Sequence, residues 1–440
     1  MSVNLARVVA RREGTTRAAR CLRVLSRVLH KRHGKWYAAV EQSGLSGSNF
    51  LFSLLIVRSD GVAALGEYGF WFVICQLLAM IALALAVRQM VLQAADRGVR
   101  EQRFALTATL WIVLALQAVQ TLAIVVFVLL RTPESHAIEF AVSLMVYTAI
   151  LNLSVLFRQY FYMRGRQRLS MLYTTLGLTM GFAAFVAFVL FGDDGSLALF
   201  AFWFLALGHG LYLLLAAAHS STLRLLRAGT NRPIGEVVRE YWQPGLPSMG
   251  GMAVTWLQNQ SVTPLLMLMM GPLAVGYYQL ARMVITPVNM VTQGLAMSAL
   301  PQIRRAWGNG DEAALQRSIA GHLRLSMRVV AGYLLALVPL WIGTSALGLF
   351  DSGQALLPMF CATVLVMILS NYRFWYSQPY VVRLEFGFLL RLGIGASALA
   401  VLGMLVAGYG LGSESLVILG SAVGEIYLIV VLRRRLKPAP

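Results

Sequence analysis

Five polar residues between 279 and 293 fall on one side of an expected membrane helix. Within an apolar run at about 272 to 300, the polar positions are spaced by 3, 4, 3 and 4 residues, and they are Gln279, Arg282, Thr286, Asn289 and Gln293. Because a helix turns once in about 3.6 residues, this spacing places all five side chains on one stripe. A guanidinium attracts anionic groups, while amides and hydroxyls form hydrogen bonds. We therefore expect this face to be wet or bonded to another group.

Arg282 is the residue on this stripe that costs most to bury. It follows the start of its run by about ten residues, or roughly 15 Å at 1.5 Å per residue, which is close to the bilayer midplane. A midplane arginine costs roughly 2.5 to 3.5 kcal/mol on insertion scales, so it needs a water-filled cavity, an acidic partner or an anionic cargo. Glu425, at a similar depth in the last run, is the candidate partner. Both the ion pair and the cargo contact remain open, and we favour the cargo contact.

Two other runs contain polar residues at comparable depth. In the run at about 36 to 57 the spacings are 4, 3 and 4, for Gln42, Ser46, Asn49 and Ser53. In the run at about 246 to 268 three amides are consecutive, namely Gln258, Asn259 and Gln260. Amides also bond helix to helix, with about 0.6 kcal/mol per bond on average, but three polar stripes together favour a shared cavity. Arg58, at the outer end of the first run, is either an exit contact for an anionic headgroup or a topology signal.

The elements that must position these residues are membrane helices. The chain has 440 residues, of which 58% are hydrophobic and 12% charged, and its mean hydropathy is +0.69. A helix of about 20 apolar residues crosses the hydrocarbon core. The sequence predicts an all-α membrane protein with about twelve spans, at roughly 36 to 57, 67 to 90, 104 to 130, 137 to 162, 170 to 191, 196 to 218, 246 to 268, 272 to 300, 325 to 348, 354 to 378, 386 to 408 and 412 to 432.

The charges indicate how these spans are oriented. The net charge is +19, and arginines cluster in alternate connections, as cytoplasmic loops require. Residues 1–35 contain ten Lys or Arg and one acid, which predicts a basic cytoplasmic tail with an interfacial amphipathic helix. Residues 433–440 form a second basic tail. We expect both termini in the cytoplasm, contacts with membrane lipids, and no binding of nucleic acid.

An internal repeat divides the chain into two halves. The segment Gly61-Val-Ala-Ala-Leu-Gly-Glu-Tyr recurs about 210 residues later as Gly271-Pro-Leu-Ala-Val-Gly-Tyr-Tyr, and each opens the second helix of its half. The longest connection, 219–245, lies between the halves. The sequence therefore predicts six-helix bundles at 36–218 and 246–432, in the parallel arrangement that transporters use.

No enzymatic chemistry is indicated. The sequence contains no nucleotide-phosphate loop, no G-x-S-x-G or H-E-x-x-H motif and no paired catalytic acids. Its histidines and three cysteines show no metal-ligand spacing. We therefore expect no metal site, no cofactor and no catalytic residue.

The chain resembles the multidrug/oligosaccharidyl-lipid/polysaccharide (MOP) exporter superfamily, and within it the Wzx-type flippases. The resemblance is in Val62-Ala-Ala-Leu-Gly-Glu-Tyr-Gly, and in Gly271-Pro-Leu-Ala-Val-Gly-Tyr-Tyr-Gln-Leu-Ala-Arg leading into Ala299-Leu-Pro-Gln-Ile-Arg-Arg. It implies a V-shaped pair of bundles around a central cavity in a bacterial inner membrane protein. The implied cargo is an oligosaccharide on undecaprenyl diphosphate, exported for surface polysaccharide, with a polymerase and other assembly proteins as partners.

In such a flippase Arg282 would hold the diphosphate, with Asn49, Gln258, Asn259, Asn289 and Gln293 around it. Two alternatives remain. A cation-coupled multidrug exporter has the same fold, but the midplane of the cavity helices contains none of the acids that such exporters use. A membrane polysaccharide polymerase or ligase is the alternative of another class, although the expected outward loops are short.

Overall fold

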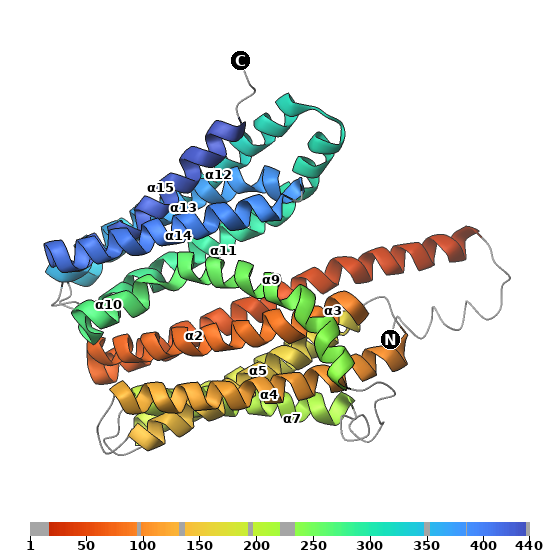
Figure 1. The fold of residues 1–440 in the computed structure, drawn as a ribbon, viewed down its shortest axis with the longest axis horizontal. Coiled ribbons are helices and arrows are strands. Elements are labelled where there is room, and N and C mark those ends of the chain that lie inside the picture. The colour runs from red at the N-terminus through yellow and green to blue at the C-terminus, as the bar shows by residue number, and fades with distance from the viewer. Residues whose placement is uncertain are drawn as a thin grey trace.

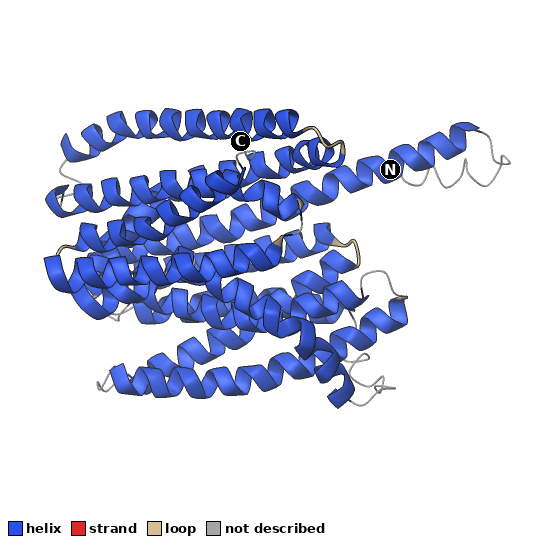
Figure 2. Ribbon diagram, turned by 45° about the horizontal axis from the view of Figure 1, so that its top comes forward, coloured by secondary structure: helices blue, strands red, loops and turns tan. Residues whose placement is uncertain are grey.

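The computed structural model describes residues 17–94, 98–131, 137–191, 197–220, 234–346, 353–383 and 385–436. Helices make up nearly all of this described part (Figure 2). In the first half they are α2 (Arg17–Ala82), the π-helical turn η1 (Leu83–Val87), α3 (Arg88–Ala94), α4 (Val99–Arg131), α5 (Ala137–Met163), α6 (Gln167–Phe191) and α7 (Leu197–Ser220). In the second half they are α9 (Ile234–Gln260), α10 (Val262–Met270), α11 (Pro272–Gly308), α12 (Glu312–Ala346), α13 (Gly353–Val382), α14 (Phe386–Leu405), η2 (Val406–Gly410) and α15 (Glu414–Leu436).

Within this described part the helices are long enough for about twelve crossings, the number that the sequence predicts. Eight stretches are long and apolar enough to span a membrane, and the first of them, Val40–Ala94, has 55 residues. That is more than twice the length a bilayer requires, and the stretch turns at Gly61, so it supplies two crossings. The more polar helices α9 with α10, α11 and α12 are long enough to cross a bilayer three more times.

Gly61 and Gly271 confirm the internal repeat in their backbone geometry. Gly61 has φ 85° and ψ −176°, and Gly271 has φ 84° and ψ −175°. This region of backbone space is essentially restricted to glycine. Each glycine reverses the chain between the first and second crossing of its half, so the two halves begin with the same hairpin.

The helices form two bundles that meet along α2 and α11. The N-bundle comprises α2 to α7, in which α7 packs against α5 and α6. The C-bundle comprises α10 to α15, in which α15 packs against α13 and α14. The bundles approach each other at the end that contains Gly61 and Gly271, and they diverge toward the opposite end (Figure 1). This arrangement agrees with the predicted V shape.

Helix α9 connects the two bundles. Its first part lies within the segment expected to connect the halves, and there Val237 and Tyr241 are buried in a cluster of N-bundle side chains. Its last part packs against α14 of the C-bundle. Pro244 and Pro247 lie between these parts, and each removes a backbone hydrogen bond from the helix. Helix α9 therefore contacts the N-bundle before the two prolines and the C-bundle after them.

The predicted tails lie only partly within the described residues. Helix α2 begins at Arg17, and α15 ends at Leu436 with three arginines in its last turn. The side chains of the interfacial helix expected within residues 1–35 are outside the described residues. The same holds for residues 221–233 of the expected connection.

Candidate substrate cavity

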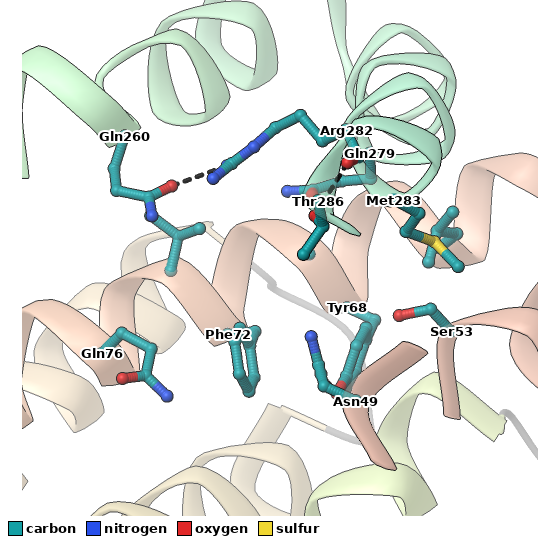
Figure 3. A pocket seen from close by; sticks show the side chains of 13 residues that line it. Asn49, Ser53, Tyr68, Phe72, Gln76, Gln260, Gln279, Arg282, Met283 and Thr286 are labelled. Atoms are coloured by element: carbon teal, nitrogen blue, oxygen red, sulfur yellow. Dashed lines mark hydrogen bonds between the residues drawn. The ribbon is translucent and has the colours of Figure 1, made fainter. Parts of the chain in front are cut away.

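A cavity of about 130 Å³ lies between the bundles, where α2 faces α11 and the end of α9. Figure 3 shows the side chains that line it. They come from both halves of the chain and are Asn49, Ser53, Leu65, Tyr68, Gly69, Phe72, Val73, Gln76, Gln260, Gln279, Arg282, Met283 and Thr286. Four of the nine residues predicted to bind substrate are among them, namely Asn49, Gln260, Gln279 and Arg282.

Arg282 is held in the cavity by an amide and an aromatic ring. Its Nη1 donates a hydrogen bond of 2.6 Å to Oε1 of Gln260, and its guanidinium carbon lies 5.6 Å from the centre of the Tyr278 ring. No carboxylate of the described residues forms an ion pair with it. The positive charge is therefore held by neutral groups, and it can attract an anion that enters the cavity.

The C-bundle wall also supplies the amide of Gln279 and the hydroxyl of Thr286. Nε2 of Gln279 donates to Oγ1 of Thr263 at 3.4 Å. Thr286, one turn beyond Arg282, donates its hydroxyl to the Arg282 carbonyl oxygen at 2.8 Å. Both residues are on the stripe expected from the sequence, and Figure 3 shows them beside Arg282 on α11. Three of the five residues on that stripe therefore line the cavity.

The N-bundle wall contains two polar residues that the sequence did not single out. The hydroxyl of Tyr68 donates to Oδ1 of Asn49 at 2.7 Å, and Gln76 lies two turns further along α2. Tyr68, Phe72 and Gln76 follow one another at intervals of four residues. This spacing could have indicated that the three side chains share one helix face. It was not noticed because the surrounding run is otherwise apolar.

The two walls differ in charge despite the repeat. Adding 210 to a position in the first half gives its counterpart, so Tyr68 corresponds to Tyr278 and Gln76 to Thr286. Arg282 corresponds to Phe72. The cavity thus has a cationic wall from the C-bundle and a neutral, hydroxyl- and amide-containing wall from the N-bundle.

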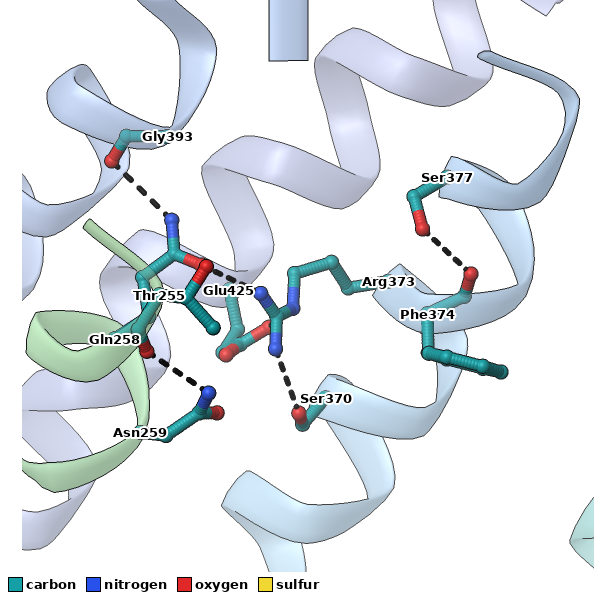
Figure 4. Close-up of polar contacts among 9 residues, drawn as sticks. All are labelled: Thr255, Gln258, Asn259, Ser370, Arg373, Phe374, Ser377, Gly393 and Glu425. Atoms are coloured by element: carbon teal, nitrogen blue, oxygen red, sulfur yellow. Dashed lines mark hydrogen bonds and ion pairs between the residues drawn. The ribbon is translucent and has the colours of Figure 1, made fainter. Parts of the chain in front are cut away.

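Gln258 does not line this cavity. Its Oε1 accepts a hydrogen bond of 2.6 Å from Nη1 of Arg373, and its Nε2 donates to the Gly393 carbonyl oxygen at 3.2 Å. Figure 4 shows the side chain directed into the C-bundle. Residues two positions apart in a helix point about 200° apart, so Gln258 and Gln260 cannot both face the cavity.

The acidic partner considered for Arg282 belongs to another arginine. Nε of Arg373 lies 2.8 Å from Oε2 of Glu425, whose side chain is only 7% exposed. Nη2 of Arg373 also donates to Ser370 at 3.1 Å (Figure 4). The alternative in which Arg282 pairs with Glu425 is therefore wrong in this structure. Depth alone could not identify the pair, because the packing of α13 against α15 decides which arginine reaches Glu425.

Four other predicted residues lie elsewhere. Asn259 is exposed and donates to the Thr255 carbonyl oxygen one turn earlier at 2.9 Å. Asn289 and Arg58 are also exposed and do not line the cavity. The side chain of Gln293 is outside the described residues.

Glu41 is a buried carboxylate of the N-bundle that the sequence did not single out. It is 1% exposed and accepts hydrogen bonds from Tyr162 at 2.7 Å, Ser170 at 3.0 Å and Thr174 at 2.8 Å. Among the described side chains, no arginine forms an ion pair with it. The acid at the start of the first apolar run was the available signal. Three hydroxyl donors stabilise this carboxylate away from the cavity.

Solved structures of membrane transporters are similar to this chain. An inward-facing multidrug resistance MATE family transporter of the MOP superfamily gives a TM-score of 0.71 at 15% identity, over 88% of this chain and 94% of that one. An outward-facing structure of such a transporter gives 0.61 at 15% identity, over 91% and 94%. A MOP superfamily transporter from Pyrococcus furiosus, whose binding pocket is described as reversed in polarity and as suggesting a different function, gives 0.60 at 16%, over 91% and 94%.

No protein-family model and no curated protein matches the chain. The structural similarities establish its fold, which is that of MATE transporters of the MOP superfamily, and they confirm the predicted fold class. The chain is a multi-pass membrane protein whose structural neighbours are transporters. At this level of identity the similarity concerns the fold alone, so the Wzx-type assignment stays a prediction.

Proposed function

We propose that this protein moves an oligosaccharide linked to undecaprenyl diphosphate across the bacterial inner membrane by alternating access. The observation that supports this most directly is Arg282, a cation without a carboxylate partner among the described residues, in a cavity between the two bundles. Both termini would lie in the cytoplasm. A polymerase and other membrane proteins of polysaccharide assembly would act on the cargo afterwards, and the protein itself would be no enzyme.

The cavity contains suitable groups for both parts of this cargo. A guanidinium binds phosphate oxygens through two parallel N–H donors. The amides of Gln76, Gln260 and Gln279 can donate to and accept from sugar hydroxyls. Gln260 already accepts a hydrogen bond from Arg282, so the cargo diphosphate would replace this amide as the partner of the guanidinium.

The cavity is smaller than the proposed cargo requires. Its volume is about 130 Å³, whereas pockets for small ligands commonly measure about 300 to 1,000 Å³. The bundles must therefore separate further for a sugar diphosphate to enter. This agrees with a transport cycle in which the bundles move relative to each other.

The proposal predicts that Arg282 determines affinity for the diphosphate. We expect Arg282→Ala to weaken binding of undecaprenyl diphosphate to the purified full-length chain about 10- to 100-fold, since charged hydrogen bonds contribute about 1.5 to 3 kcal/mol. Arg282→Lys should retain part of the affinity. Native mass spectrometry with titrated lipid measures these affinities.

Two controls make this experiment specific. Arg58→Ala removes an exposed arginine outside the cavity and should leave affinity within about twofold of the unmodified chain. Undecaprenol, which lacks the diphosphate, should bind the unmodified chain and the Arg282→Ala variant equally. If Arg282→Ala bound undecaprenyl diphosphate as tightly as the unmodified chain, the site assignment would be wrong.

A cation-coupled multidrug exporter is the second candidate, and Glu41 is the observation that favours it. This carboxylate is buried, lacks an ion-pair partner among the described side chains and is surrounded by hydroxyls. A buried carboxylate in a membrane helix is a candidate site for ion coupling. Two of the structural neighbours are described as multidrug resistance transporters, which also agrees with this candidate.

Glu41→Gln separates the two candidates. Since Glu41 lies outside the cavity, we expect this variant to bind undecaprenyl diphosphate within about twofold of the unmodified chain. An exporter of cationic drugs would instead remove ethidium from cells, and Glu41→Gln would reduce that efflux at least about tenfold. We expect cells that express the unmodified chain to show no ethidium efflux above cells without it. Efflux that Glu41→Gln abolishes would support the exporter and contradict the flippase.

A further inference from the structure

The bundles touch through two glycines at the end of the molecule where Gly61 and Gly271 reverse the chain. A Cβ atom on Gly66 of α2 would overlap the backbone carbonyl oxygen of Pro272 at the start of α11. A Cβ atom on Gly276 of α11 would overlap the carbonyl oxygen of Val62 on α2. Backbone oxygens cannot rotate away as a flexible side chain can. These two contacts therefore exist only because both residues are glycine.

The two contacts are equivalent under the internal repeat. Val62 and Gly66 correspond to Pro272 and Gly276 when 210 is added, so each half supplies one glycine and one carbonyl oxygen. Both glycines are buried. The contact is thus a reciprocal interface between the two copies of one hairpin.

The glycine contacts adjoin the cavity. Leu65, which precedes Gly66, lines the cavity, and so does Gly69 one turn further along α2. A Cβ atom on Gly69 would lie 2.7 Å from Cγ of Gln279, so α2 and α11 remain in close contact beside the polar residues.

Apart from Gly69 and the contacts of helix α9, the other close glycine contacts in the described part of the chain join helices of the same bundle. Gly177 and Gly208 bring α6 against α7, and Gly403 and Gly420 bring α14 against α15. Those pairs are intact whenever each bundle is folded. The Gly66 and Gly276 contacts lie between the bundles, so any motion that separates the bundles at this end must break them.

We propose that Gly66 and Gly276 form a glycine gate, defined as their reciprocal contacts with the carbonyl oxygens of Pro272 and Val62, which seals this end of the cavity. Closure requires both helices to approach without side chains between them. A methyl group at either position holds the gate open. The proposal does not depend on which cargo the protein transports.

Distances between spin labels at Ala63 and Leu273 test the gate. These residues are equivalent in the repeat and both exposed, next to the contacts. In the full-length chain with its three natural cysteines replaced by alanine, double electron–electron resonance should give mainly a short distance. Gly66→Ala and Gly276→Ala should each lower the ratio of short to long distances at least about tenfold, and the double variant should remove the short distance.

Matched controls are available in the same protein. Gly250→Ala and Gly251→Ala add a methyl group to helix α9 where no atom lies within 4 Å, and they should keep the short distance. If either gate variant does not fold, cross-linking of Ala63→Cys with Leu273→Cys by a short bifunctional maleimide, compared between the other gate variant and Gly250→Ala, gives the same information. Folded gate variants with the unmodified distance distribution and cross-linking rate would overturn the gate. Because no cargo is used, this result is independent of the affinity of Arg282 for diphosphate.

Discussion

Glu425→Ala is expected to lower the free energy of unfolding by about 3 to 5 kcal/mol, the usual cost of removing one partner from a buried ion pair. The substitution leaves the guanidinium of Arg373 between α13 and α15 with only the neutral oxygens of Gln258 and Ser370. Unfolding of the purified protein in detergent, followed by temperature or denaturant, measures the loss.

A second ion pair of the C-bundle provides the control. Arg435 and Glu385 lie 3.5 Å apart, but their side chains are 52% and 30% exposed. Exposed pairs contribute at most about 1 kcal/mol, so Glu385→Ala should change stability little. The double variant Arg373→Met, Glu425→Leu should recover most of the stability lost in Glu425→Ala, since it leaves no unpaired charge. If Glu425→Ala and Glu385→Ala lowered the free energy of unfolding equally, the loss in Glu425→Ala would not be due to the burial of its ion pair.

Gly177→Ala is expected to destabilise the N-bundle by about 3 kcal/mol, at the upper end of the usual cost of overpacking. Its new methyl group would overlap the carbonyl oxygen of Gly208, so α6 and α7 would have to move apart. Helices in membranes associate mainly through such close backbone contacts. Thermal unfolding in detergent measures the change.

Gly210→Ala on α7 should instead stabilise the N-bundle. A Cβ atom there meets only Cδ1 of Ile150 at 3.8 Å, which is ordinary contact, and alanine is favoured over glycine in a helix by about 0.5 to 1 kcal/mol. A Gly177→Ala protein as stable as Gly210→Ala would contradict the described packing of α6 on α7. Unlike substitutions at the gate, neither change should alter the distance between labels at Ala63 and Leu273.

Much of the fold follows from local properties of the chain. Apolar runs of about 20 residues must be helical in lipid, because every backbone group needs a partner within its own segment. The repeat is visible because Gly61 and Gly271 occupy a conformation that other residues rarely adopt. Neither signal depends on which helix packs against which, so both survive in the sequence alone.

The cavity was predictable where helical spacing defines one face. Arg282 and Gln279 share a stripe on α11, and both line the cavity. Spacing failed for Gln258, where three consecutive amides gave no preferred face, and the side chain bonds to Arg373 instead. Tyr68 was missed because tyrosine is common in apolar helices. Its role in the cavity is visible only from its hydrogen bond to Asn49 in the folded structure.

By itself the sequence determined a helical membrane protein in two repeated halves, with a cation in the second half. These features could be predicted because hydropathy, glycine conformation and the cost of a buried charge are properties of single segments. Only the tertiary structure decided that Glu425 pairs with Arg373, and that Arg282 lies in the cavity without a carboxylate partner among the described residues. The same holds for the contacts of Gly66 and Gly276 between the bundles. These features depend on the distance and rotation between helices far apart in the chain, and a change of 100° in rotation exchanges a cavity residue for a buried one.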